Sequence, residues 1–230
     1  MSLTGCAFKG FQSETPEEPK KPTKTIWFDD IGEPLPLSDE DQKILIQVAW
    51  DAVANSIDSN ENIDLISKLP IEYIGDNQPR IIFISISDAQ SAAKVILGQG
   101  KGLISALEDA IQKSRGFVNQ NFQPKWLKMD IVGDVSKIKN RGSAFELERS
   151  LYGLAMPRNL KLAFLPEELV ASSIIDSNQI LRTNYLADYL SERGNQYGGV
   201  SPSILVIEAE TEFFRFKTIS QFTDGSVTKA

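Results

Sequence analysis

The sequence predicts a single α+β domain over residues 25–230, in which helices pack on the faces of a mixed sheet. A capped amphipathic helix opens this part of the chain, a short β-branched run follows it, and further strand-like and helical segments alternate without an internal repeat. With 230 residues, 41% of them hydrophobic, the chain can build one good core. No apolar run approaches the roughly 18 residues that a spanning helix needs.

The first helix is predicted to begin after Ser38. Serine is a favoured N-cap residue, and the acidic Asp41 three positions later can complete a capping box. Apolar residues then recur on one helical face, at Ile44, Leu45, Val48, Ala52, Val53 and Ile57.

Runs rich in β-branched and aromatic residues predict the strands. They cover residues 80–87, 93–97, 126–132, 160–165 and 204–216. Helical spacing is found over 103–114, and Pro166 begins a second helix whose first turn contains two glutamates. A further helix is predicted from residue 176 or 177 to 193, while 145–156 is ambiguous between strand and helix.

The segment Leu3-Thr4-Gly5-Cys6 matches the cleavage site of a bacterial lipoprotein, with Cys6 as the lipidated residue. A complete signal peptide has an apolar region of roughly 7 to 15 residues before the cleavage site, and only Met1 and Ser2 precede this motif. The alternative to a lipidated cysteine is therefore an ordinary cysteine in a flexible terminus. Residues up to 24 are rich in proline and charge, which predicts a disordered tether over 1–24.

The composition excludes several kinds of chemistry. The chain has no histidine and a single cysteine, so imidazole catalysis, histidine-ligated zinc and an internal disulfide are impossible. A net charge of −7 argues against nucleic acid as a partner. We interpret the densest basic stretch as a solvated face; it contains Lys125, Lys128, Lys137, Lys139 and Arg141, interrupted by Asp130 and Asp134. The sequence predicts neither a cofactor nor a metal ion.

A glycine-rich segment is the first candidate for ligand binding. Gly98, Gly100, Lys101 and Gly102 lie between a predicted strand and a predicted helix, where backbone N–H groups can hold an anion beside the lysine. The alternative is a structural turn, for which we expect Gly98, Gly100 or both to adopt a backbone geometry forbidden to other residues.

Carboxylates are the second candidate. Glu146 and Glu148 share one side if their segment is a strand, which would give the acid pair that glycoside hydrolysis uses. Glu208 belongs to an alternating acidic row in the last predicted strand, which a water-facing strand also explains. The aromatic residues of segment 27–30 are expected to be buried and to anchor the end of the tether.

Residues 38–193 resemble, in segment order, the AMME syndrome candidate-gene family, whose domain is α+β and whose biochemical role is unsettled. The resemblance rests on Ile44-Leu45 with Ala49, Phe83-Ile84-Ser85-Ile86, the turn from Leu97 to Gly102, Ala106 with Ala110, and Phe164-Leu165-Pro166. That family's signature turn is Arg-Gly-Cys-Ile-Gly, whereas this chain has Gly98-Gln99-Gly100-Lys101-Gly102. Because the cysteine is missing, no thiol activity follows from the resemblance. Separately, the segment 212–217 with Gly225 is similar to the exit of amino-terminal domains that precede a helical toroid in envelope carbohydrate enzymes.

Together these features predict a lipid-anchored, extracytoplasmic binding or scaffolding domain of the bacterial cell envelope. Acylated Cys6 would anchor it to the bilayer, at the periplasmic face of the outer membrane. Its envelope ligand or protein partner is not specified by the sequence. The alternative is a carbohydrate-active envelope enzyme, or its amino-terminal accessory domain, that uses Glu146, Glu148 or Glu208 as acid and base.

Overall fold

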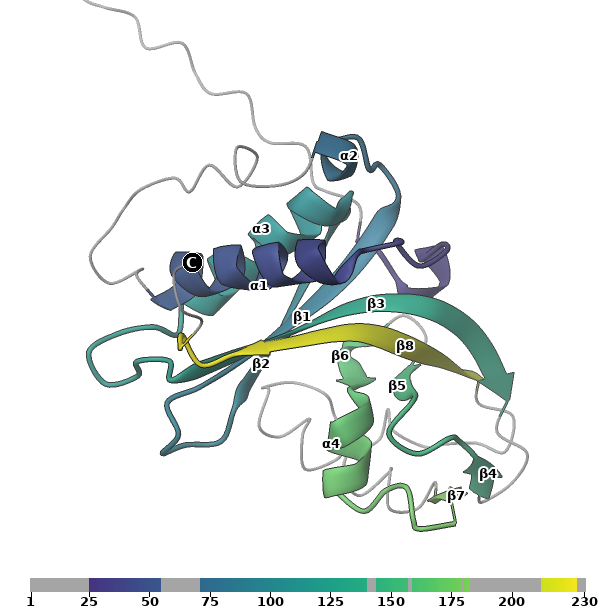
Figure 1. The fold of residues 1–230 in the computed structure, drawn as a ribbon. Coiled ribbons are helices and arrows are strands. Elements are labelled where there is room, and N and C mark those ends of the chain that lie inside the picture. The colour runs from purple at the N-terminus through teal and green to yellow at the C-terminus, as the bar shows by residue number, and fades with distance from the viewer. Residues whose placement is uncertain are drawn as a thin grey trace, which may run out of the picture.

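The computed structural model describes residues 25–54, 71–139, 144–156, 159–178, 180–182 and 212–226. The predicted tether, Cys6 and Glu208 lie outside these ranges. Within them the α+β class is confirmed: one six-stranded sheet is accompanied by helices and by a small two-stranded sheet (Figure 1).

The large sheet has the strand order β2-β1-β3-β8-β5-β6. Its strands are β1 (Pro79–Ser87), β2 (Lys94–Lys101), β3 (Trp126–Lys139), β5 (Gly153–Met156), β6 (Asn159–Phe164) and β8 (Glu212–Thr223). The small sheet pairs β4 (Ala144–Glu146) with β7 (Ile180–Arg182). Every pairing among the described strands is antiparallel, whereas the sequence predicted a mixed sheet. The short connections from β1 to β2 and from β5 to β6 favour hairpins, which are antiparallel.

Three helices pack against the large sheet. Two long helices, α1 (Asp39–Ala54) and α3 (Leu103–Arg115), cover one face of β1, β2 and β3, while the short helix α4 (Pro166–Ala171) follows β6 and packs against β5 at the other end of the sheet (Figure 1). A single turn, α2 (Ile71–Ile74), precedes β1, and a 3-10 turn, η1, spans Phe28–Asp30. No helix in the described ranges is both long and apolar enough to cross a bilayer.

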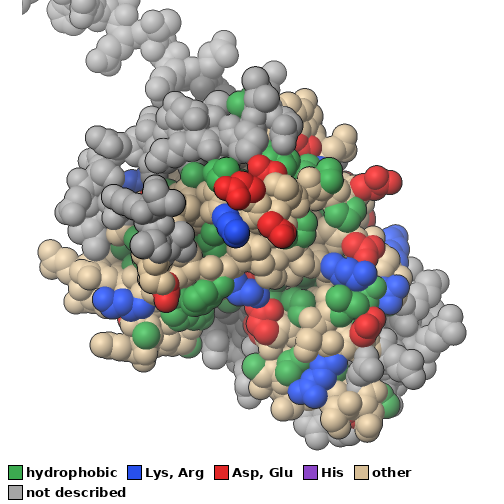
Figure 2. Space-filling model, in the orientation of Figure 1, with side chains coloured by type: hydrophobic (Ala, Val, Ile, Leu, Met, Phe, Trp, Pro, Cys, Tyr) green, Lys and Arg blue, Asp and Glu red, His purple; other side chains and the backbone are tan. Residues whose placement is uncertain are grey.

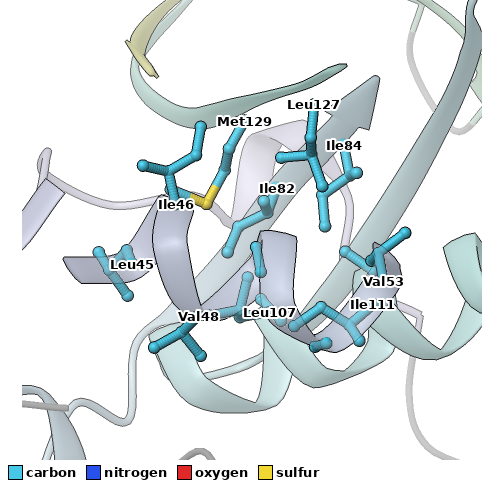
Figure 3. Close-up of a cluster of buried hydrophobic side chains, with 14 of the residues drawn as sticks. Leu45, Ile46, Val48, Val53, Ile82, Ile84, Leu107, Ile111, Leu127 and Met129 are labelled. Carbon is cyan, nitrogen blue, oxygen red and sulfur yellow. The ribbon is translucent and has the colours of Figure 1, made fainter. Parts of the chain in front are cut away.

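The start of α1 is capped as predicted. The Asp41 N–H donates to Ser38 Oγ at 3.2 Å, and the Ser38 N–H donates to Asp41 Oδ2 at 3.3 Å. This reciprocal pair satisfies backbone donors that a helix terminus leaves free. The apolar face of α1 then packs against α3 and the sheet, in a cluster that includes Leu45, Ile82 and Met129 (Figure 3).

The opposite face of the sheet curls around a second cluster. Phe216 of β8 lies between Phe28 and Phe83, with ring centroids 5.0 and 6.1 Å away. Leu97 of β2 and Ala163 of β6, on the two outermost strands, belong to this same cluster. Phe28 is 2% exposed, which confirms that segment 27–30 buries an aromatic side chain.

Several predicted elements differ from the structure in type or extent. β2 ends at Lys101 and β3 at Lys139, beyond the predicted ends at residues 97 and 132. The ambiguous segment 145–156 divides into the end of β4, a turn and β5. Residues 180–182 form β7 where the sequence predicted a helix from residue 176 or 177, because these residues pair with β4. The last strand continues to Thr223, well beyond the predicted end at residue 216, because it pairs along the length of β3.

Candidate functional site

Gly98 and Gly100 lie within β2 and pack directly beneath α3. A Cβ atom at Gly98 would lie 2.4 Å from the carbonyl oxygen of Ala106 and 2.4 Å from the backbone nitrogen of Ala110. One at Gly100 would lie 2.5 Å from the nitrogen of Ala106. Neither glycine has a positive φ, so the expectation of forbidden backbone geometry at these two positions is wrong. They are glycines because the helix backbone approaches the strand too closely for a side chain.

The turn itself is made by Gly102, with φ at 91°. A Cβ atom there would lie 2.1 Å from the carbonyl oxygen of Asp76. The Gly102 N–H donates to Gln78 O at 2.8 Å, and the Leu103 N–H donates to Asp76 Oδ2 at 3.0 Å. The carboxylate of Asp76 therefore occupies the position predicted from the sequence for an external anion, beside the exposed Lys101.

Asp76 is held in place by Arg80. The Arg80 Nε donates to Asp76 Oδ2 at 2.9 Å, and both side chains are nearly buried. Desolvation opposes ionisation of Asp76, but hydrogen bonds from Arg80 and from the backbone of Gln78 and Leu103, with the charge of Arg80, outweigh it and lower its pKa. The glycine segment is thus a closed structural junction between β2, α3 and the loop before β1.

The outer edge of β2 is also covered. The Gln99 N–H donates to Asp109 Oδ2 at 2.8 Å, and Lys113 Nζ donates to Leu97 O at 3.0 Å. These α3 side chains bind backbone groups that an edge strand would otherwise offer to another chain.

The predicted Glu146–Glu148 pair is not formed by a common strand. β4 ends at Glu146, and Glu148 is exposed in the turn that follows, where its carbonyl oxygen accepts from the Leu151 and Tyr152 N–H groups. Strand alternation therefore does not place the two carboxylates on one side. The side chain of Glu146 is not described.

A different group of charged residues comes together between the sheet and α4. We call it the Lys128 cluster, consisting of Lys128, Asp130, Glu167 and Ser220. Lys128 Nζ lies 2.9 Å from Asp130 Oδ1 and also donates to Glu167 Oε1, in the first turn of α4. Ser220 Oγ of β8 donates to Asp130 Oδ1. The side chains of Asp130, Lys128 and Glu167 are 0%, 23% and 54% exposed, so the cluster extends from the interior to the surface.

Burial controls the protonation of this cluster. Desolvation raises the pKa of Asp130, and Glu167 adds to the effect, although Lys128 and Ser220 oppose it. Desolvation alone would lower the pKa of Lys128, but the charges and hydrogen bonds of Asp130 and Glu167 outweigh it and raise the pKa. The ammonium of Lys128 is therefore retained at neutral pH.

The second carboxylate oxygen of Asp130 differs from the first in its contacts. Within the described part of the chain, Asp130 Oδ2 is buried and has no hydrogen-bond partner. A buried unpaired carboxylate oxygen is costly, and such atoms usually bind an ordered water or belong to a site.

Two aromatic residues adjoin the cluster on the same face of the sheet. Phe222 is the direct partner of Lys128 in the β3–β8 register, and Trp126 lies two residues before Lys128 on β3. The rings of Trp126 and Phe222 are 5.9 Å apart and tilted by 37°, and Phe222 is 58% exposed. On the face shown in Figure 2, hydrophobic side chains gather over the C-terminal end of β8, with basic and acidic side chains next to them. We refer to Trp126 and Phe222 as the aromatic pair.

The sequence does not reveal this site, because the basic stretch that contains Lys128 has the composition of a solvated face. Lys125 and Lys137 are exposed as expected, but Asp130 is fully buried and Lys128 is largely buried. The period-2 alternation of Trp126, Lys128 and Asp130 places them on one strand face, and only α4 and β8 convert that face into an enclosed cluster.

Among the described residues, no group of three or more His, Cys, Asp or Glu side chains is arranged to hold a metal ion. A scan of protein-family models and a search of curated proteins both found no match for this chain.

Proposed function

We propose that the protein is a lipid-anchored binding or scaffolding domain of the bacterial cell envelope, and that it contacts its envelope partner through the aromatic pair and the adjoining Lys128 cluster. The Leu3–Cys6 motif supports the anchor and the address. The binding surface rests on one observation: Phe222 is 58% exposed beside Trp126 and directly across from Lys128. Exposed aromatic groups bordered by polar residues are typical of interaction sites.

The geometry favours binding over catalysis. A raised pKa keeps Lys128 protonated, so it cannot act as the base that activates Ser220. Asp130 is fully covered and therefore does not touch a molecule that binds at the surface. The cluster's charged groups are paired with one another, which suits a rigid contact surface.

One observation favours the alternative function, that of an enzyme. Asp130 and Glu167 both contact the one ammonium of Lys128, and burial raises the pKa of Asp130. A pair of neighbouring carboxyl groups is the kind of arrangement that glycoside hydrolysis uses. In the alternative, a carbohydrate-active enzyme or its accessory domain, the exposed Glu167 is the carboxylate that contacts the substrate, and Asp130 acts only through Lys128. The segment-order resemblance to the AMME syndrome candidate-gene family stays a proposal about relationship and adds no residue to either function.

The anchor is tested by lipid labelling. Expressed in bacteria with its native upstream sequence, the protein should partition into detergent and incorporate labelled palmitate, because a processed lipoprotein carries several acyl chains. Cys6→Ser should abolish the labelling. Equal labelling of the variant and the wild type would refute the anchor.

The contact surface is tested with isolated bacterial envelopes. The affinity of the purified protein for envelopes, measured by co-sedimentation, should fall by about tenfold or more in Phe222→Ala, as expected for an exposed aromatic contact. Phe117→Ala is the matched control, since Phe117 is 45% exposed but lies beyond the end of α3. Equal sedimentation of the two variants would remove the aromatic pair as the contact surface. If the wild type hydrolyses envelope glycans and Glu167→Gln abolishes this activity, the enzyme alternative is supported instead.

A further inference from the structure

We infer that the aromatic pair and the Lys128 cluster bind a neutral sugar unit of a glycan. This inference rests on the proposed function and names the ligand class of the same site. The site combines three features on one face of the β3–β8 pair: exposed aromatic surface, a partly exposed ion pair, and a buried carboxylate with one unpaired oxygen.

The aromatic pair supplies the apolar part of the site. The C–H groups on one side of a pyranose ring form an apolar surface that packs against an aromatic ring. Phe222 is 58% exposed, and its tilt of 37° to the Trp126 ring presents two ring surfaces that are not coplanar. Rigid aromatic side chains provide such contact area at low entropic cost.

The ion pair supplies polar contacts that match hydroxyl groups. Lys128 Nζ donates hydrogen bonds and is 23% exposed, while the Glu167 carboxylate accepts them and is 54% exposed. A hydroxyl can both donate to a carboxylate and accept from an ammonium, so neighbouring hydroxyls on a sugar can contact both groups at once. Ser220, in an exposed position on β8, adds a third polar group.

The charges of the cluster select against anionic ligands. When Asp130 and Glu167 are ionised, two negative charges face the single positive charge of Lys128. A phosphate or uronic acid therefore meets net negative charge, and an anionic bilayer surface is disfavoured for the same reason. A fully apolar ligand would cover the ion pair without replacing its hydration, which costs free energy.

Asp130 positions the ammonium group of Lys128 from the buried side of the cluster. Its Oδ1 contacts Lys128 Nζ at 2.9 Å, which holds the lysine side chain beside Phe222 on the same sheet face. Its second oxygen, Oδ2, is buried and has no hydrogen-bond partner in the described part of the chain. Asp130 is thus a positioning residue that does not contact the ligand directly.

The test uses four defined probes and the intrinsic fluorescence of tryptophan, with calorimetry as a second readout. The probes are chitotetraose, maltotetraose, tetragalacturonate, and vesicles of phosphatidylethanolamine with phosphatidylglycerol. At least one of the two neutral sugars should bind saturably, with Kd below about 10 mM. Tetragalacturonate and the vesicles should bind more weakly than that sugar.

Variants then locate the site. Phe222→Ala should weaken binding of the neutral sugar by about tenfold, while Phe117→Ala leaves it unchanged. Glu167→Gln should weaken binding of the neutral sugar but strengthen binding of tetragalacturonate, because it removes one negative charge and keeps an acceptor oxygen. Asp130→Asn should weaken sugar binding less than Phe222→Ala does.

Two outcomes overturn the inference. One is that neither neutral sugar binds below about 10 mM, or that its binding is unaffected by Phe222→Ala. The other is that vesicles or tetragalacturonate bind more tightly than both neutral sugars, which would assign the site to a membrane surface or an acidic glycan. If envelope sedimentation still depends on Phe222 in either case, the proposed binding function stands and only the ligand class is wrong.

Discussion

Substituting Gly98 by alanine tests how α3 is held against the sheet. The added Cβ would lie 2.4 Å from two backbone atoms of α3, about 1 Å closer than ordinary van der Waals contact. Neither atom belongs to a flexible side chain, so the relief must come from a shift of the helix or of the edge strand β2.

The expected cost follows from what that shift disturbs. α3 buries Leu103, Leu107 and Ile111 against the sheet and α1. Overpacking a core typically costs 1–3 kcal/mol, and the rigid contacts place Gly98→Ala at about 2–3 kcal/mol. For a domain of this size, the melting temperature should fall by roughly 5–10 °C.

Urea unfolding and thermal unfolding, both followed by circular dichroism, measure this cost. Gly75→Ala is the matched control, because a Cβ at Gly75 meets nothing within 4 Å. The control should be neutral or slightly stabilising, since alanine restricts the unfolded chain more than glycine does. If Gly98→Ala were as stable as Gly75→Ala, the close approach of α3 to β2 would be wrong.

Two further predictions concern buried carboxylates. Because the folded pKa of Asp130 is raised, its ionisation destabilises the fold at high pH, and the wild type should gain stability relative to Asp130→Asn as the pH falls toward 3.8. Urea unfolding from neutral pH downward measures the difference between the two proteins, and a difference independent of pH would contradict the burial of Asp130. Because the folded pKa of Asp76 is lowered, its stabilising effect is present above 3.8 and is lost as the pH falls through the folded pKa. Asp76→Asn should lower the free energy of unfolding by about 3 kcal/mol or more at neutral pH, because it leaves buried Arg80 without its counter-charge. The variant should also lose less stability than the wild type when the pH is lowered. An acid transition that is the same in both proteins would refute the role of Asp76.

Elements with local signals could be predicted from the sequence. Ser38 and Asp41 identified the start of α1, and the run of β-branched residues in 80–87 identified β1. Pro166 correctly marked the first residue of α4. In each case the determining contacts lie within a few residues, so the sequence alone contains the relevant chemistry.

Elements that depend on distant partners could not be predicted in the same way. Residues 180–182 have no strong strand signal and form β7 by pairing with β4. The glycines at 98 and 100 suggested a turn, because the sequence does not show that α3 folds back over β2. Tertiary context overrode the local pattern at both places.

The sequence by itself determined the α+β class, the absence of imidazole chemistry, and the positions of α1, β1 and α3. It also determined that Trp126, Lys128 and Asp130 alternate on one strand. Only the tertiary structure decided that this strand face is partly enclosed, since Lys128 meets Glu167 across 39 positions and Asp130 meets Ser220 across 90. The physical reason is that a charged side chain is solvated until other parts of the chain cover it, and burial then changes both its pKa and its partners.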